Sequence, residues 1–347
     1  MGKQWPLFSI IIASRNGKDW IKNCLGSVLA SDYPNLEVIF VDDASDDGSP
    51  ELVKKKFPYK NIKVIQNKKN LGWSGTNNQG IPYAKGEYLV FLSNDMEVKK
   101  NWLKQLLKTF EIDPKIGVVQ CFSVSMKDKK TVDSPRNYLD RFGFLYSYRP
   151  SKKPAEVFFA EGMAFAIRKR LVDQKILLDD YFTMEYDDAD YGWRARLAGW
   201  KVYFAPEAIV YHARGGTVGG NYFSRQIANL RQYSRNQLVT LIKNYEIKNM
   251  LLALPVAFLL HFGKGVFLLV RGYPRLCLAV WQGLSQVFLD LPIILEKRRL
   301  IQKKRKVSDK ELMKTMVPFR PSFMVSYITL QAKGLRPVFQ EEPKFLS

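Results

Sequence analysis

Four short apolar runs in the first third of the chain restrict the folds that it can adopt. They cover residues 8–13, 36–41, 62–65 and 88–92. Ile and Val are frequent in them, which is typical of parallel strands that are buried on both faces of a sheet. Stretches with a helical pattern separate the runs, at residues 20–30, 50–57 and 76–84. This alternation predicts an α/β fold in which helices flank a mostly parallel, doubly wound sheet.

Polar or acidic residues follow each of the four runs. They are Ser14, Arg15 and Asn16 after the first run, Asp42 and Asp43 after the second, Asn70 and Gly72 after the third, and Asn94 and Asp95 after the fourth. Open α/β sheets bind ligands beyond the carboxyl ends of their strands. Any single acidic turn is more typical of a plain turn than of a site. Four polar turns in succession at one edge nevertheless predict a binding site there.

A second acidic segment lies within residues 115–215, which keep an α/β pattern with predicted strands at 157–167 and 202–210. Residues 185–190, around the start of a predicted helix at 187–199, contain four crowded carboxylates, Glu185, Asp187, Asp188 and Asp190. Carboxylates this close raise one another's pKa unless solvent, a metal or a helix N-terminus relieves the repulsion. The segment is therefore either a solvated helix start or a general base that is held beside a charged substrate.

The chain contains two histidines. His212 follows a predicted strand, so it either forms hydrogen bonds within the fold or binds a metal together with Asp95, because imidazole and carboxylate are both common ligands. On its own, Asp95 is more typical of a turn. His261 lies in the apolar C-terminal part and is predicted to be interfacial.

The composition changes from residue 250 onward. Residues 250–260 carry no charge, 263–270 carry one lysine, and 276–295 carry only Asp290. Seven basic residues follow within 297–306. An apolar stretch beside a basic cluster is typical of helices that lie on an anionic membrane surface. Membrane-spanning helices, a helical subdomain on the catalytic core and a homodimer contact are the alternatives.

Charge and cysteine content exclude several classes of protein. The chain has 54 Lys and Arg against 33 Asp and Glu, a formal net charge of +21, which implies a polyanionic partner. Anionic lipid and phosphorylated small molecules fit this charge, whereas the acidic turns would repel nucleic acid. Three cysteines without a CxxC pair argue against a disulfide framework and a zinc knuckle. The glycine string at 215–220 has the spacing of neither a dinucleotide site nor a P-loop.

The order and spacing of these motifs resemble glycosyltransferase family 2. The matching stretches are FSIIIASRNG, VIFVDDASDDGS, NKKNLGWSGTNNQG, GEYLVFLSNDMEV, FFAEGMAFAIRKR, MEYDDADYGWRARLAGW and AIVYHARGG. The resemblance covers residues 6–240 and is greatest to the rhamnosyltransferase-like members, which act on bacterial cell-surface polysaccharides. It implies a GT-A fold, a nucleotide-sugar donor and a metal-dependent, inverting mechanism.

The resemblance also implies roles for individual residues. Asp42 and Asp43 match residues that contact the nucleoside base. The other nucleotide-binding positions are Ser14, Arg15, Asn16, Asn70, Gly72, Asn77 and Asn94. Asp95 matches the last Asp of the DxD motif, which binds Mg or Mn, and His212 matches a histidine that completes the metal shell in some relatives. The catalytic base is Asp188 or its neighbour Asp187, which stands where the family has Glu.

The resulting hypothesis is an inverting transferase that moves a sugar, rhamnose first of all, to a glycan or polyprenyl-linked acceptor. The expected donor is dTDP-rhamnose or a UDP-sugar. We predict a catalytic domain at residues 1–240, a membrane-associated helical region at 241–307 and a tail at 308–347, located at the cytoplasmic face of the membrane. The alternatives are a catalytically impaired glycan-binding relative, for which Ser93 in place of the first DxD acid leaves room, and a basic nucleic-acid-binding protein.

Overall fold

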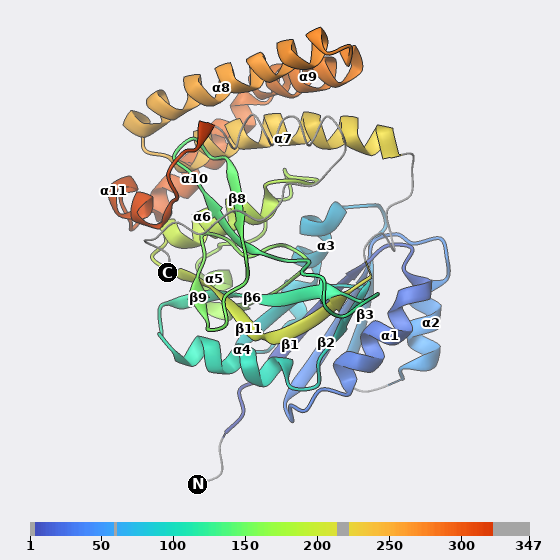
Figure 1. The fold of residues 1–347 in the computed structure, drawn as a ribbon. Coiled ribbons are helices and arrows are strands. Elements are labelled where there is room, and N and C mark those ends of the chain that lie inside the picture. Colours follow the sequence, from blue (N-terminus) through green and yellow to red (C-terminus); the bar gives the residue numbers. More distant parts are fainter. Residues whose placement is uncertain (1–3, 59–60, 214–221, 322–347) are drawn as a thin grey trace. The chain divides into compact units, whose positions relative to one another are not determined.

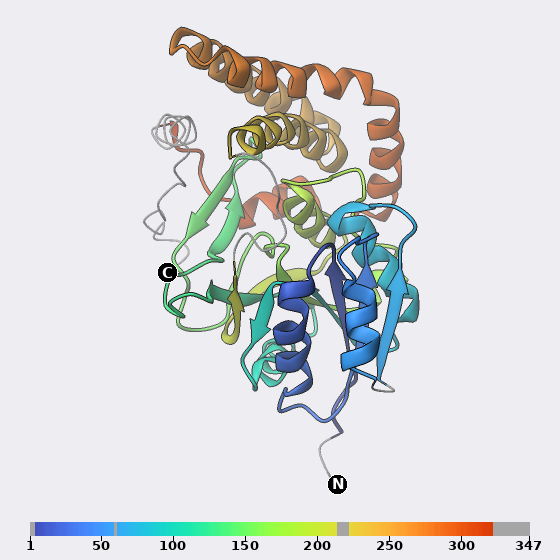
Figure 2. The same ribbon diagram turned by 90° about the vertical axis from the view of Figure 1, so that its right-hand side faces the viewer.

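The computed structural model describes residues 4–58, 61–213 and 222–321. The glycine string at 215–220 and most of the predicted tail, from residue 322 onward, lie outside this part of the chain. The chain forms two compact units, each drawn from several stretches of sequence (Figures 1 and 2). The first unit comprises Met1–Arg136, Pro150–Thr183 and Trp200–Val218, and the second comprises Asn137–Arg149, Met184–Gly199 and Gly219–Ser347.

The first unit is built on one mixed sheet. Its strands are β1 (Phe8–Ser14), β2 (Leu36–Asp42), β3 (Ile62–Gln66), β4 (Tyr88–Ser93), β5 (Met96–Val98), β6 (Ile116–Ser125), β9 (Ala155–Glu156), β10 (Ala164–Arg168) and β11 (Lys201–His212). They pair in the order β3-β2-β1-β4-β10-β6-β11-β5, with β9 beside β11. Strands β1 to β4 are parallel, whereas β10 is antiparallel to both β4 and β6. The predicted α/β fold with helices flanking a sheet is confirmed, and the antiparallel pairs of β10 and β5 make that sheet mixed.

Register brings the ends of the first strands together. Ser14 pairs with Asp42, and Asp42 pairs with Gln66, so β1, β2 and β3 end level with one another. Ala13 pairs with Ser93, the last residue of β4. Since these strands are parallel, the polar turns that follow them leave the sheet at one edge, as the sequence predicted.

One predicted strand, at residues 157–167, is wrong over most of its length. Only β10, from Ala164 to Arg168, is a strand. Val157 and Phe158 are fully buried although they lie outside any strand. An apolar run predicts that residues are buried, but it does not by itself show that they form a strand.

Helices flank the sheet of the first unit. They are α1 (Lys18–Leu29), α2 (Ser49–Lys56), α3 (Gly72–Gly80), α4 (Trp102–Glu111) and α5 (Lys169–Asp173), with a short 3₁₀ turn at Ile81–Tyr83. Helix α4 shows why they form, because Trp102, Leu103, Leu106 and Phe110 recur at helical spacing and are all buried. Each such side chain contributes about 2 kcal/mol through removal from water, which fastens α4 to β6 and β11.

The second unit is helical apart from a two-stranded hairpin, β7 (Arg136–Leu139) and β8 (Leu145–Tyr148). Its helices are α6 (Asp187–Leu197), α7 (Tyr222–Asn244), α8 (Ile247–Val270), α9 (Pro274–Leu289), α10 (Leu291–Lys304) and α11 (Asp309–Leu312), with a 3₁₀ turn at Met313–Thr315. Helices α7, α8 and α9 lie side by side (Figures 1 and 2). Gly283 permits the contact of α9 with α7, because a Cβ there would lie 2.3 Å from the Arg231 carbonyl oxygen.

Two features of the second unit bear on membranes. Within the described residues, α8 is the one helix that is long and apolar enough to cross a bilayer by itself. Helices α9 and α10 reach that length only together, and they are bent by 66° at their junction. Pro292 lies in the first turn of α10, where its ring can start a helix but cannot continue one from α9.

Candidate functional site

The turn after β1 is tied to the end of β4. The side-chain amide of Asn94 donates to Ser14 Oγ at 2.8 Å, and both residues are buried. Gly17 makes this possible, because a Cβ on it would lie 1.7 Å from Asn94 Nδ2. Ser14 and Asn94, which the sequence placed in the nucleotide pocket, therefore lie together.

The same turn is tied to the turn after β2. The backbone N–H of Asn16 donates to Ser45 Oγ at 2.9 Å, and Asn16 Oδ1 accepts from the backbone N–H of Asp46 at 3.1 Å. Asn16 has a positive φ of 48°, a conformation that Asn tolerates better than most residues. Arg15 next to it is exposed, so its guanidinium is accessible from solvent.

Asp43 holds the loop that leads into α3. Its carboxylate accepts from Asn67 Nδ2 at 3.1 Å, from the backbone N–H of Leu71 at 2.8 Å and from that of Gly72 at 3.2 Å. Asn70 Oδ1 also accepts from the N–H of Gly72, at 2.8 Å. One hydrogen-bonded loop thus contains Asp43, Asn70 and Gly72. Asp43 therefore stabilises this loop, in addition to any contact that it makes with the nucleoside base of a donor.

Asp42 and Asn77 are more deeply placed than the sequence suggested. Asp42 is 1% exposed, and its Oδ2 accepts from the backbone N–H of Ser45 at 3.1 Å. Burial raises the pKa of the Asp42 carboxyl above its ordinary value. Asn77 is fully buried within α3, and its side-chain amide donates to the Trp73 carbonyl at 2.9 Å.

Asp95 and His212 meet at the other side of this edge. Strand β11 pairs with β5 so that His212 lies opposite Met96, and the backbone N–H of Ala213 donates to the Asp95 carbonyl at 3.1 Å. This pairing brings His212 Nε2 within 3.2 Å of Asp95 Oδ2. The other imidazole nitrogen, Nδ1, is bonded to Asp133 Oδ2.

The Asp95–His212 pair has a donor set and a spacing that suit a divalent cation. Ligand distances of about 2.1 Å place neighbouring donors of one cation about 3 Å apart, close to the 3.2 Å found here. No group of three or more His, Cys, Asp or Glu side chains suited to a metal occurs in the described residues. A cation held here would therefore draw its other ligands from water or phosphate oxygens, as Mg²⁺ commonly does.

Asp133 is a residue that the sequence did not reveal. It is 5% exposed, and its Oδ2 also accepts from Ser123 Oγ at 3.2 Å. A carboxylate on one ring nitrogen of a ligand histidine fixes the tautomer and aims the other nitrogen at the metal. Asp133 thus orients Nε2 of His212 toward Asp95.

Asp133→Asn is expected to weaken Mn²⁺ binding by about 10- to 100-fold, because a neutral amide is a weaker acceptor than a carboxylate for Nδ1–H of His212 and holds its tautomer less firmly. Titration of the protein with Mn²⁺, followed by electron paramagnetic resonance, measures this change. Asp128→Asn is the matched control, since Asp128 bonds only within its own exposed turn. An unchanged Mn²⁺ affinity in Asp133→Asn would show that Asp133 only stabilises the fold.

The acidic segment of the second unit starts with a strained turn. Glu185 and Tyr186 have positive φ values of 59° and 69°, which non-glycine residues rarely adopt. Helix α7 holds the turn in place, because Asn236 Nδ2 donates to the carbonyls of Met184 and Glu185 at 2.8 Å each. The buried Tyr186 hydroxyl donates to Gln237 Oε1 at 3.1 Å. Backbone strain that surrounding contacts maintain is common at functional sites.

The four crowded carboxylates are not equivalent. Asp190 is fully buried and forms ion pairs with Lys243 Nζ at 2.9 Å and Arg194 Nε at 2.6 Å, so it fastens α6 to α7. Asp187 and Asp188 are partly exposed in the first turn of α6. Burial raises the pKa of the Asp187 carboxyl to about 6. Asp188 Oδ1 accepts from the backbone N–H of Ala189 at 2.7 Å.

Comparison with known proteins finds a similarity to one family over part of the chain. Residues 9–175 match the family model described as Glycosyl transferase family 2. The chain is 24% identical over 219 residues to the poly-β-1,6-N-acetyl-D-glucosamine synthase of Staphylococcus aureus, a match that covers 62% of this chain and 52% of that protein. It is also 28% identical over 130 residues to the putative glycosyltransferase EpsH of Bacillus subtilis, a match that covers 37% of this chain and 38% of that protein. The chain thus matches about half or less of the length of these curated relatives.

Solved structures agree on the fold. A mannosyltransferase from Pyrobaculum calidifontis, in complex with GDP-Man and Mn²⁺, has a TM-score of 0.55 at 17% identity, over 95% of this chain and 85% of that one. TarS of S. aureus, residues 1–349 in complex with UDP-GlcNAc, has a TM-score of 0.57 at 19% identity, over 86% and 88% of the two chains. The predicted GT-A-type fold is confirmed, whereas the rhamnosyltransferase subgroup stays a prediction.

Proposed function

We propose that this protein is an inverting, cation-assisted glycosyltransferase that uses a nucleotide-sugar donor. The observation that carries the proposal is the pairing of Asp95 with His212 at the sheet edge where the polar turns of β1, β2 and β4 end. The match to the glycosyl transferase family 2 model supports it. So do the donor complexes of structures with the same fold, which contain GDP-Man or UDP-GlcNAc.

The first unit is assigned to donor binding. Ser14, Arg15 and Asn16 come from the turn after β1, and Asn94 joins them from the end of β4. We assign Asp42 and Asp43 to the nucleoside and the Asn70–Gly72 loop to the wall of its pocket. The exposed guanidinium of Arg15 is a suitable partner for a phosphate of the donor.

We assign Asp95 and His212 as the residues that would hold an Mg²⁺ or Mn²⁺ ion. A cation held there would offset the negative charge that develops on the departing nucleoside diphosphate. Asp133 keeps the imidazole of His212 oriented for this task.

Asp188 is assigned to the acceptor. The attacking hydroxyl must lose its proton as it bonds to the anomeric carbon, and a fixed carboxylate can take that proton. The strained Glu185–Tyr186 turn and its bonds to Asn236 and Gln237 restrict where the first turn of α6 can lie. Asp187 is the alternative base, and its raised pKa suits that role.

A nucleotide-sugar screen by thermal shift tests the proposed donor class. We expect the Tm to rise with a nucleotide sugar in the presence of Mn²⁺ and to rise less without it, since a ligand that binds only the folded state stabilises it by about 2.7 kcal/mol at a hundredfold excess over Kd. A rise in Tm with dTDP-rhamnose alone would support rhamnose as the transferred sugar. A rise with UDP-sugars instead would identify a UDP-sugar as the donor and contradict the prediction of rhamnose. If no nucleotide sugar shifts the Tm, the proposal fails.

The acceptor is proposed to be a glycan or a polyprenyl-linked sugar of a cell-surface polysaccharide. The similarity to a poly-β-1,6-N-acetyl-D-glucosamine synthase supports a polysaccharide product. A lipid-linked acceptor would place the enzyme at the cytoplasmic face of the membrane. The apolar helix α8 and the seven basic residues within 297–306, in and directly after α10, support that location.

A further inference from the structure

Helix α8 is amphipathic in the opposite sense from a helix on the surface of a soluble protein. Its buried face contains His261 and Lys264, together with the small residues Ala253 and Ala257. Apart from Lys248 in its first turn, its exposed face is dominated by large apolar residues, which are Ile247, Leu251, Leu252, Leu259, Phe262, Val266, Leu269 and Val270. Leu259 is 67% exposed and Val270 81% exposed. Large exposed apolar patches mark interaction surfaces.

The buried face of α8 is bonded to the helix that holds the acidic turn. His261 Nε2 lies 2.9 Å from Gln237 Oε1, and the Lys264 ammonium lies 5.6 Å from the centre of the Tyr233 ring. Gln237 in turn accepts from the Tyr186 hydroxyl. If α8 crossed a bilayer, the packing would carry α7 and the Glu185–Tyr186 turn into the hydrocarbon with it. Moving their many polar groups out of water would cost free energy. This packing favours an α8 that lies in the plane of the membrane.

The next two helices also expose large apolar residues. These are Leu278, Phe288 and Leu289 of α9 and Leu291, Ile293, Leu295 and Leu300 of α10. Exposed cations lie at both ends of α8, with Arg271 and Arg275 where the chain turns into α9, and Arg299 and Lys303 of α10 near its start. An apolar face with a cationic border matches an anionic lipid surface in charge and in polarity.

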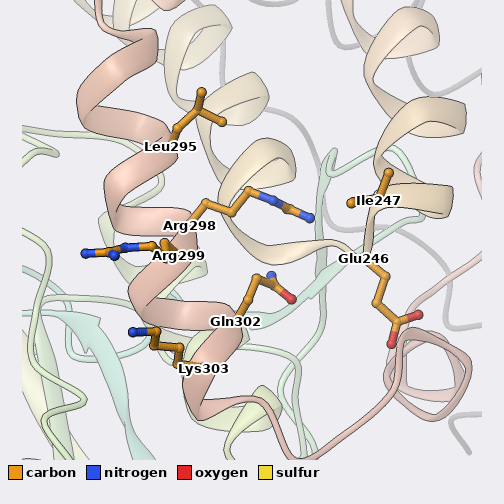
Figure 3. Close-up of a pocket in the computed structure, with 7 residues that line it drawn as sticks. All are labelled: Glu246, Ile247, Leu295, Arg298, Arg299, Gln302 and Lys303. Carbon is orange, nitrogen blue, oxygen red and sulfur yellow. The ribbon is translucent and has the colours of Figure 1, made fainter.

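A hollow of about 630 Å³ opens beside this border, between the start of α8 and α10 (Figure 3). Ile247 and Leu295 give it an apolar wall, while Arg298, Arg299 and Lys303 are its cations. The Arg298 side chain is already engaged within the protein, because its Nη1 donates to the carbonyls of Ile242 and Tyr245 at the end of α7.

Arg299 and Lys303 are the cations of this hollow that can serve a ligand. They are exposed, and Figure 3 shows them extending together from one side of α10. The carboxylate in the lining is that of Glu246, which lies 3.8 Å from the Arg305 guanidinium. The rim of the hollow therefore has a positive balance of charge.

We propose that the exposed faces of α8, α9 and α10 form a docking surface for an anionic membrane leaflet, with α8 in the membrane plane and lipid phosphates held by Arg299 and Lys303. This inference rests on the proposed membrane location and adds the residues that face the lipid and those that hold its phosphates. A phospholipid offers both a chain for the apolar wall of the hollow and a phosphate for its rim.

Vesicle sedimentation of the full chain, without sugar donor, tests this docking. Wild-type protein is expected to bind vesicles in which about a third of the lipid is phosphatidylglycerol, and to bind pure phosphatidylcholine more weakly. Arg299→Gln with Lys303→Gln should weaken binding to the anionic vesicles by about thirtyfold, at about a factor of five for each cation near the surface. Leu259→Ser with Phe262→Ser should weaken binding to both kinds of vesicle.

Lys55→Gln with Lys56→Gln is the matched control. Both lysines are exposed on α2, and replacing them removes the same amount of positive charge from the first unit. An equal loss in this control would reduce the effect to net charge and overturn the proposal. So would displacement by inorganic phosphate at the concentration of the lipid phosphate, which would indicate a site for free anions. A wild-type dimer that Leu259→Ser with Phe262→Ser converts to a monomer would assign the face to a second copy of the chain.

The same experiment separates this inference from the proposed function. Thermal shifts with nucleotide sugars are expected to be the same for wild type and for Arg299→Gln with Lys303→Gln. Donor binding without vesicle binding would overturn only the docking surface. Vesicle binding without any response to nucleotide sugars would overturn only the transferase proposal.

Discussion

Asp188→Asn is expected to lower the rate of glycosyl transfer by about a thousandfold and to leave donor binding unchanged. The substitution keeps the shape of the side chain and removes its ability to accept a proton from the acceptor hydroxyl, a contribution of about 10²- to 10⁴-fold. Product formation measured at saturating donor gives the loss in kcat. The thermal shift with donor and Mn²⁺ reports on binding, and loss of both together would assign Asp188 a structural role.

Asp187→Asn is the matched control, since it neutralises the adjacent carboxylate in the same helical turn. We expect it to keep transfer within about tenfold of wild type and to stabilise the protein at neutral pH. The pKa of Asp187 rises from its ordinary value of 3.8 to about 6 on folding. Between these values the folded state binds more protons than the unfolded state, so stability is lost as the pH rises through about 6.

Asp187→Asn should therefore stabilise the protein more at about pH 8 than at about pH 4. We expect the two gains in unfolding free energy to differ by about 1–3 kcal/mol, because the partly exposed carboxyl is screened by solvent. The Tm of the variant and of wild type at both pH values measures this difference. The reverse assignment of the base has a distinct signature. If Asp187→Asn abolishes transfer and the wild-type rate falls below about pH 6, Asp187 is the base and Asp188 is not.

The sheet and its binding edge were predictable because both depend on local patterns. Apolar runs separated by helical stretches define β1 to β4, and parallel strands must release their polar turns at one edge. The motif at 185–190 predicted a helix start, and α6 begins at Asp187. The run at 157–167 misled the prediction, because its buried residues lie mostly outside a strand.

The partners of the site residues were not predictable from local patterns. Asp133 lies in a loop far from His212 in sequence, and nothing around it marks it as the acceptor of an imidazole. The same holds for Lys243, which pairs with the buried Asp190, one of the four crowded carboxylates. Gly17 carried a clearer signal, because a glycine just after a strand often allows a close approach of another side chain.

Asp95→Asn is expected to lower transfer by about a thousandfold and to weaken Mn²⁺ binding together with it. A carboxylate at 3.2 Å from His212 Nε2 supplies the negative charge of this pair, and an amide supplies only a dipole. Loss of the cation would remove several kcal/mol of stabilisation from the departing diphosphate, and about 4 kcal/mol corresponds to a thousandfold in rate. Transfer rates over a Mn²⁺ titration measure both effects.

Glu97→Gln is the matched control for Asp95→Asn, because Glu97 lies two residues further along the chain, in β5, where it pairs with Tyr211 next to His212. It removes the same charge from the same segment, so transfer should stay within about threefold of wild type if the cation binds specifically to Asp95. Ser93, two residues before Asp95, has no carboxylate, so under the proposed function Asp95 is the acid of this turn on which cation binding would depend. If Asp95→Asn retains full transfer in the presence of a chelator, the cation is dispensable, and positive side chains such as Arg15 must stabilise the diphosphate instead.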